Sequence, residues 1–152
     1  MPPFLQTEDG VCFVSITRLR VRCWRFVPAF FLYAFRSARQ AARAEGNLAT
    51  LLLRDRGNTF WTATRWTTEA AMKKFMLAGM HRKAMRKLAH WCDEAALAHW
   101  TQEREELPSW AEVCRRLERE GRPSKVDHPS ATHTAHRFPQ PEVRAGSELH
   151  FK

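Results

Sequence analysis

The stretch that most constrains the fold of this chain runs from Asn58 to Trp100. Its first ten residues alternate between two faces, with Phe60, Thr62, Thr64 and Trp66 on one and Trp61, Ala63 and Arg65 on the other. Aromatic and β-branched side chains with a period of two are typical of a half-buried strand. A strand is therefore predicted over residues 58–67.

An amphipathic helix is predicted directly after this strand. Thr67 and Thr68 offer an N-cap, and Glu69 places a negative charge in the first turn. Apolar residues then recur at three- and four-residue spacing, namely Ala71, Met72, Phe75, Met76, Gly79 and Met80. The pattern predicts one helix that ends around Leu88 to Trp91, followed by a short strand over residues 96–102.

The chain before this stretch predicts a strand, a helix and a second strand. Residues 11–22 alternate and form the first strand, in which Arg18, Arg20 and Arg22 share one face. This arginine row is either exposed to solvent or a clamp for an anion. A helix is predicted over residues 23–45 and a strand over residues 47–54, which a turn at 55–58 joins to the next strand.

The first helix carries a basic stripe beside its apolar face. Arg36, Arg39 and Arg43 follow one another at three- and four-residue spacing. Such a stripe is either a hydrated face, or it places Arg36 together with Gln40 toward a cavity.

The order strand, helix, strand, strand, helix, strand predicts an α+β, ferredoxin-like domain over residues 11–103. Its antiparallel sheet has both helices on one face. The other face is apolar and aromatic, so we expect a second copy of the chain to cover it and form a dimeric α+β barrel. Residues 1–10 are predicted to be an irregular lead-in, and residues 104–152 a short helix from the capping box Ser109 to Glu112 and an extended, partly disordered tail.

Charge and composition limit the partners of this chain. Lys and Arg exceed Asp and Glu by 16 to 8 over residues 1–103 and by 9 to 8 over residues 104–152, so the positive excess belongs to the domain and not to a basic tail. The longest apolar run, residues 26–35, is too short to span a bilayer and too far from Met1 for a secretory signal. We expect a cytoplasmic protein with no membrane partner.

The chemistry of the chain is expected in a pocket between the helices and the sheet, because no local nucleotide, metal or nucleophile motif occurs. The aromatic and apolar residues expected to line this pocket are Trp24, Trp61, Trp66, Phe75, Met76 and Met80. His81 lies beside the apolar side of the second helix, either as a core residue or as a base or haem ligand. The cations expected to orient an anionic group are Arg65, Arg18 and Arg36.

The element order and the sequences TFWTATRW, TTEAAMKKFMLAGMHRKAM and RKLAHWCDEAALAHW resemble the antibiotic-biosynthesis-monooxygenase superfamily of dimeric α+β barrels. The part around His81, Trp91 and Glu94 is similar to the second half of the spheroidene monooxygenase family and of uncharacterised relatives. The resemblance spans residues 11–103 and implies a homodimer. It also implies that His81 occupies the position of a histidine in haem-using members, although the pattern of the haem-degrading branch is not reproduced.

Three functions follow as alternatives. The first is a monooxygenase-like protein that binds a small hydrophobic or aromatic molecule, with haem as an optional cofactor, His81 as ligand or base and no other metal site. The second is a non-catalytic binding or interaction module of the same fold, favoured by the shortage of paired acid–base groups. The third is RNA binding on an open sheet, but the strands lack the glycine–aromatic pattern of RNA-binding sheets, so we expect no nucleic-acid partner.

Overall fold

A computed structural model describes residues 10–151 of the chain, apart from four side chains in one helix, those of Met80, His81, Arg82 and Ala84. The predicted lead-in lies, except for Gly10, outside these described residues. The elements in chain order are β1 (Cys12–Val21), the 3-10 helix η2 (Trp24–Phe26), α1 (Val27–Arg43), β2 (Asn47–Asp55), β3 (Thr59–Trp66), α2 (Glu69–Met76), α3 (Gly79–Trp91), β4 (Cys92–Gln102), α4 (Trp110–Glu120), β5 (Arg122–Pro123), α5 (Ala131–Ala135) and β6 (Glu148–Phe151).

The strands form one sheet in the order β5-β4-β1-β3-β2-β6, in which every neighbouring pair is antiparallel. The inner order β4-β1-β3-β2 is that of a ferredoxin-like domain, so the predicted α+β fold is confirmed. The predicted end of the domain at residue 103 falls next to the end of β4. The two outer strands come from the C-terminal segment and extend both edges of the sheet.

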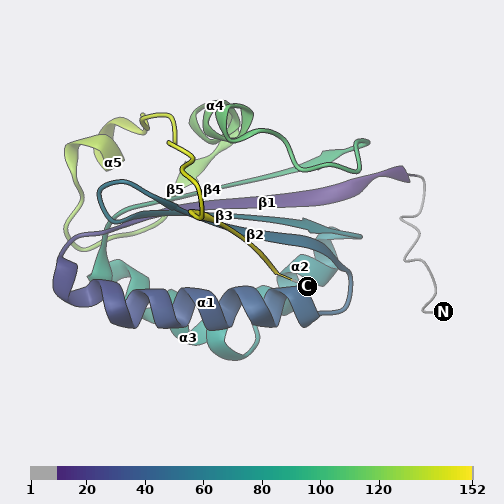
Figure 1. Cartoon of the computed structure of the whole chain (residues 1–152), viewed down its shortest axis with the longest axis horizontal. Helices are drawn as coiled ribbons and strands as arrows, with labels where there is room; N and C mark the ends of the chain where they lie inside the picture. Colours follow the sequence, from purple (N-terminus) through teal and green to yellow (C-terminus); the bar gives the residue numbers. More distant parts are fainter. Residues whose placement is uncertain (1–9, 152) are drawn as a thin grey trace.

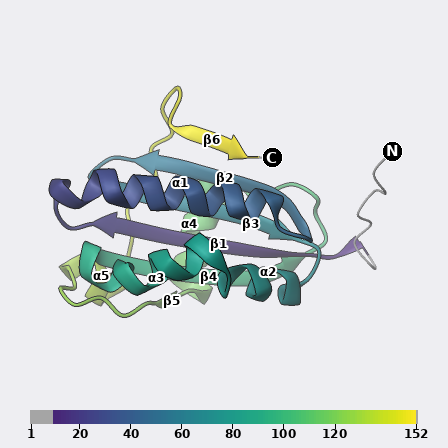
Figure 2. The ribbon, with the colours of Figure 1, turned by 90° about the horizontal axis from the view of Figure 1, so that it is seen from below.

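The molecule has three layers (Figure 1). The sheet lies in the middle, with α1, α2 and α3 on one side and α4 on the other. Figure 2, seen from the side of these helices, shows α1 running beside α2 and α3 across one face of the sheet, with β6 at the edge next to β2. Among the described residues, no helix is both long enough and apolar enough to cross a membrane.

The strand register decides which side chains share a face. Ser15 pairs with Thr64 and Thr17 pairs with Thr62, so β1 and β3 bring four hydroxyl groups to the face covered by α1 and α3. The intervening residues, such as Ile16 and its neighbour Ala63, point to the opposite face. The alternation predicted for both strands is therefore present, with a distinct role for each face.

The opposite face of the sheet is covered by the same chain, which corrects the expectation of a bare face. Val113 and Leu117 of α4, together with Phe138, pack in one buried cluster with Ile16 and Trp61 of the sheet. The expected extended tail likewise forms β5, α5 and β6 and contributes Phe138 to the core. Apolar surface drives this packing, so this face requires neither a second copy of the chain nor RNA bases to cover it.

The predicted second helix is present as two helices. Thr68 caps the first as expected, because its hydroxyl accepts a hydrogen bond from the backbone N–H of Ala71 at 3.1 Å. The chain then turns, and α3 begins at Gly79, whose φ of +52° favours glycine. A Cβ atom at Gly79 would lie 2.8 Å from the amide oxygen of Gln40, so the side chain of Gln40 would have to shift to admit one.

Candidate functional site

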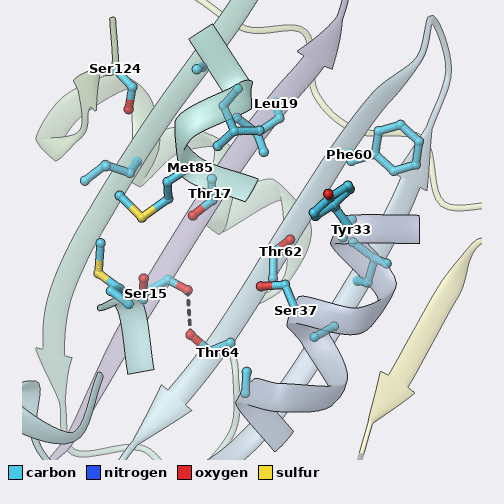
Figure 3. A pocket seen from close by; sticks show the side chains of 18 of the residues that line it. Ser15, Thr17, Leu19, Tyr33, Ser37, Phe60, Thr62, Thr64, Met85 and Ser124 are labelled. Atoms are coloured by element: carbon cyan, nitrogen blue, oxygen red, sulfur yellow. Dashed lines mark hydrogen bonds between the residues drawn. The ribbon is translucent and has the colours of Figure 1, made fainter. Parts of the chain in front are cut away.

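A chamber of about 190 Å³ lies between the sheet and the helices α1, α2 and α3 (Figure 3). Its floor is the helix-facing side of β1, β3 and β4, and its roof is built by the helices. The exposed Lys125 and Met85, of which 43% is exposed, lie where the chamber reaches the surface. A cavity of about 150 Å³ is known to hold one benzene molecule, so this chamber has room for a small ring compound.

The floor of the chamber is polar in its centre. Ser15, Thr17, Thr62 and Thr64 present their hydroxyl groups from two adjacent strands. Thr64 donates a hydrogen bond to the carbonyl oxygen of Ser15 at 3.4 Å, as Figure 3 shows. Thr64 also accepts one from the indole N–H of Trp66 at 2.8 Å. These groups can donate and accept hydrogen bonds, so they could orient a polar substituent of a ligand.

The walls and roof of the chamber are mostly apolar. They come from all three helices and from the strand ends, and include Phe30, Ala34, Ala38, Met72, Phe75, Met76, Leu88 and Trp91. Tyr33 and Ser37 add two hydroxyl groups from α1. Apolar walls around a few polar groups are the usual composition of a site for a small organic molecule.

His99 is the histidine among the described lining residues. It lies on β4 opposite Ser15, and its ring centroid is 5.5 Å from that of Phe13. Burial lowers the pKa of His99 below its usual value of 6.5. The positive charge of Arg122 lowers the pKa further, against the opposing charge of Glu69. A neutral imidazole beside the hydroxyl floor can accept a proton from a ligand.

We expect the imidazole of His99 to titrate below pH 6.5 in an NMR titration, with the His99→Gln spectrum identifying its signal. Because the unfolded chain binds this proton more readily, the stability contributed by neutral His99 is complete above pH 6.5. It is lost as the pH falls from 6.5 toward the lowered pKa. His128→Gln removes an exposed imidazole and serves as the control; a His99 signal that titrates above pH 6.5 would contradict the assignment.

The residues predicted for the pocket fall in different places. Phe75 and Met76 line the chamber as expected. Trp66 faces the same side and stacks on Phe75, with ring centroids 5.3 Å apart. Trp24 lies in η2 and is 75% exposed, away from the chamber. Arg36 lies on the exposed side of α1, in a separate groove.

Three of the predicted residues lie on the other face of the sheet. Trp61 packs under α4, and its indole N–H donates a hydrogen bond to Asp55 at 3.1 Å. Arg18 forms a buried ion pair with Glu94 at 2.6 Å. Arg65 is half-buried, and its Nε atom has no hydrogen-bond partner in the described structure. These three side chains therefore cannot reach a ligand in the chamber, because the sheet lies between them.

Met80 and His81 belong to α3, but their side chains lie outside the described part of the structure. Their predicted roles therefore stay predictions.

The hydroxyl floor and His99 are absent from the sequence-based prediction of the site. The signal was present in the alternation of β3, which places Thr62 and Thr64 on the same face as Phe60 and Trp66. Aromatic residues predict the apolar walls, whereas single hydroxyl groups are common in strands and predict no site by themselves. Only the strand pairing shows that four of them meet beside a histidine.

The described residues of the chamber do not fit haem. A porphyrin contains four pyrrole rings, whereas a cavity only slightly smaller than this one holds a single benzene molecule. Among the described side chains, no group of three or more His, Cys, Asp or Glu is placed to hold a metal ion.

Comparisons with known proteins agree with this architecture. Residues 29–87 match the family model described as Antibiotic biosynthesis monooxygenase. A candidate antibiotic biosynthesis monooxygenase from Nitrosomonas europaea superposes with a TM-score of 0.54 at 16% identity, over 60% of this chain and 89% of that one. The protein PA3566 from Pseudomonas aeruginosa gives 0.55 at 13% identity, over 60% and 94%. The NE2512 protein of unknown function from Nitrosomonas europaea gives 0.55 at 15% identity, over 66% and 97%.

At these identities the structural matches show the fold alone. No curated protein matches the chain.

Proposed function

Since this chain contains a domain of the antibiotic biosynthesis monooxygenase superfamily, we propose that it binds a small hydrophobic or aromatic molecule in the chamber and oxidises it with molecular oxygen. The observation that carries the proposal is the composition of the chamber. Apolar walls suit a ring, while the floor offers four hydroxyl groups and a neutral imidazole to a polar substituent.

The chemistry proposed for the chamber needs a substrate that can supply electrons. His99 would take the proton of a ring hydroxyl, which leaves an electron-rich anion that reacts with molecular oxygen. One oxygen atom then enters the ring and the other leaves as water. For 1,4-hydroquinone the balanced products are 2-hydroxy-1,4-benzoquinone and one water molecule. No external reductant is required, because the substrate loses two hydrogen atoms.

This activity is tested by incubating the protein with one-ring hydroquinones and phenols under ¹⁸O₂. Mass spectrometry should find one labelled oxygen atom in the product, and an oxygen electrode should show consumption above the rate without protein. His99→Gln should lower the rate while leaving the fold intact by circular dichroism. Equal rates for wild type, variant and buffer would contradict the oxidation.

Filling the chamber should prevent binding. Ala38→Leu places three additional carbon atoms on a buried position of α1 that lines the chamber. If the added atoms deprive the ligand of the burial of two CH₂-sized groups, its binding free energy weakens by about 1.6 kcal/mol. The affinity for p-cresol, measured by calorimetry, should therefore fall by about tenfold or more. Overpacking itself costs typically about 1–3 kcal/mol of stability, so folding is checked by circular dichroism.

The matched control for this variant is Ala29→Leu. Ala29 lies on the exposed side of the same helix and is not part of the chamber lining. Its affinity for p-cresol should equal that of the wild type. If Ala38→Leu also binds p-cresol like the wild type, the chamber is not the binding site.

The second candidate function is a non-catalytic binding module with the same chamber. A shortage of paired acid–base groups in the chamber favours this module. The titratable side chains of the described lining are those of His99, Tyr33 and Lys125. No carboxylate of the described lining accompanies His99. Binding of p-cresol without oxygen consumption for any compound tested would support this module over the oxygenase.

His81 belongs to the proposal as a base. The haem ligation that the resemblance to haem-using relatives implies would need a site outside the described chamber, which does not fit a porphyrin. Titration with hemin tests this role directly. A Soret shift for the wild type that is absent in His81→Ala would support it, and identical spectra for both proteins would remove it.

We also propose that the protein is a homodimer, as expected of the superfamily. The exposed Trp24 and Leu32, of which 75% and 46% are exposed, offer apolar surface for a contact away from the covered sheet face. Light scattering should then give twice the chain mass of 17.7 kDa. A mass of one chain at micromolar concentration would contradict the dimer.

A further inference from the structure

We propose that the ligand of the chamber carries an anionic group, a carboxylate or a phosphate, which binds in a basic groove beside the chamber. This inference rests on the proposed small-molecule function and adds the class of ligand. The groove has a volume of about 650 Å³ and lies between the C-terminal half of α1 and the junction of α2 and α3.

Four cationic side chains line this groove. Arg36, Arg39 and Arg43 come from one face of α1, and Lys74 comes from α2, which runs beside it (Figure 2). Glu45 is the single carboxylate among the described lining residues. A concave surface with four positive charges and one negative charge concentrates anions.

None of these four cations forms an ion pair with a described carboxylate. Three arginines elsewhere on the surface are paired, because Arg104 and Arg116 bind Glu112 and Arg144 binds Glu142. The groove cations therefore keep their charges available to a ligand. Arginine is well suited to this role, since its planar guanidinium can bind a carboxylate or a phosphate through two hydrogen bonds.

The spacing of the arginines supports the same conclusion. Arg36 and Arg39 are three residues apart, and Arg39 and Arg43 are four apart, so they are neighbours on the surface of α1. Like charges at such spacing destabilise a helix slightly. An anion bound between them would relieve this repulsion.

The groove and the chamber share Phe75 as a lining residue. This residue is 8% exposed and belongs to the lining of both cavities. Ala78 and Gly79, at the junction between α2 and α3, form the adjacent part of the groove. A ligand with its ring in the chamber and its acidic group in the groove has to pass the ring of Phe75, the residue that the two linings share.

The experiment compares acids with their uncharged amides. The ligands are phenylacetate, 3-phenylpropionate, 4-phenylbutyrate and phenyl phosphate, with the three corresponding amides and phenol as neutral partners. Affinities are measured by calorimetry at 20 mM and 500 mM NaCl on the wild type, on the double variant Arg36→Gln/Arg43→Gln and on the chamber variant Ala38→Leu. The matched control is Arg115→Gln/Arg119→Gln, which removes two exposed, unpaired charges from α4 on the other side of the sheet.

At least one acid should bind the wild type about tenfold or more tightly than its neutral partner, since a hydrogen bond to a charged group is worth at least that factor. This advantage should disappear in Arg36→Gln/Arg43→Gln, persist in Arg115→Gln/Arg119→Gln and shrink in 500 mM NaCl. Ala38→Leu should weaken acid and neutral partner alike. The number of carbon atoms between ring and carboxylate in the acid that binds most tightly measures the distance that a ligand spans past Phe75. The affinity of phenyl phosphate, compared with the affinities of the carboxylates, shows which anion is preferred.

Two results would overturn the inference while leaving the proposed function in place. Equal affinities for acids and neutral partners, both lost in Ala38→Leu, would show a chamber ligand without an anionic contact. An acid that binds through the arginines but is unaffected by Ala38→Leu would show a separate anion site. Absence of binding by all neutral and charged ligands would instead contradict the proposed function itself.

Discussion

Replacing Glu94 by alanine is expected to lower the free energy of unfolding by about 3–5 kcal/mol, because it leaves a buried guanidinium without its counter-charge. Arg18 and Glu94 are 3% and 2% exposed, and their side chains meet at 2.6 Å. Ser130 also donates a hydrogen bond to Glu94 at 2.8 Å. The Arg18 guanidinium lies over the rings of Trp61 and Phe138, which offer it no carboxylate.

Urea unfolding at pH 7 measures this loss, and the double variant Arg18→Met/Glu94→Leu is the control. Replacing both partners by apolar residues of similar size is often neutral or stabilising, so the double variant should recover most of the stability. Burial raises the pKa of Glu94, but the hydrogen bonds and charges of its partners outweigh this and bring it below the usual 4.5. Its contribution is thus complete above pH 4.5 and is lost as the pH falls through the lowered pKa. A loss below about 1 kcal/mol for Glu94→Ala would contradict the buried pair.

Phe138→Ala is expected to cost about 3–5 kcal/mol, as is usual for truncating a buried phenylalanine. The ring of Phe138 is 5% exposed and packs in the cluster that α4 forms with the outer face of the sheet. Its backbone N–H donates a hydrogen bond to Glu118 at 2.8 Å, so the main chain is held to α4 on the same side. Removing the ring would open a cavity over Arg18 and Trp61.

Thermal or urea unfolding measures the cost, with Val143→Ala as the control from the same C-terminal segment. Val143 is 50% exposed, so its truncation should change stability by less than about 0.5 kcal/mol. If Phe138→Ala lowers the free energy of unfolding as little as Val143→Ala does, the C-terminal segment does not cover the sheet as described. Light scattering on the same variant reports whether opening this face promotes self-association.

The covered sheet face has a consequence for function. Both the chamber and the basic groove are built from residues of a single chain, between α1, α2, α3 and the sheet. None of the described lining residues belongs to α4 or to the segment around Phe138. This means that α4 and Phe138 affect ligand binding only indirectly, through the stability of the sheet.

The sequence by itself determined the four strands of the ferredoxin-like order and the helices between them, although the second predicted helix is present as two, α2 and α3. Period-two alternation predicted β1 and β3, and the hydroxyl of Thr68 begins α2 as the sequence predicted. Ser109 likewise accepts a hydrogen bond from the backbone N–H of Glu112 at the start of α4. These are local interactions, in which the partners lie within a few residues of each other. A short sequence pattern therefore predicts them directly.

Only the tertiary structure decided which face of the sheet meets which partner. The alternation of β3 places Trp61 and Thr62 on opposite faces of the sheet. It does not predict that α4 covers the face of Trp61 or that the chamber lies over the face of Thr62. Arg18 can be buried because its guanidinium pairs with Glu94 at 2.6 Å. The two residues are 76 positions apart in the sequence, so no local pattern predicts this pair. Phe138 and His99 likewise take their roles from contacts between distant segments, and such contacts depend on the packing of the whole chain.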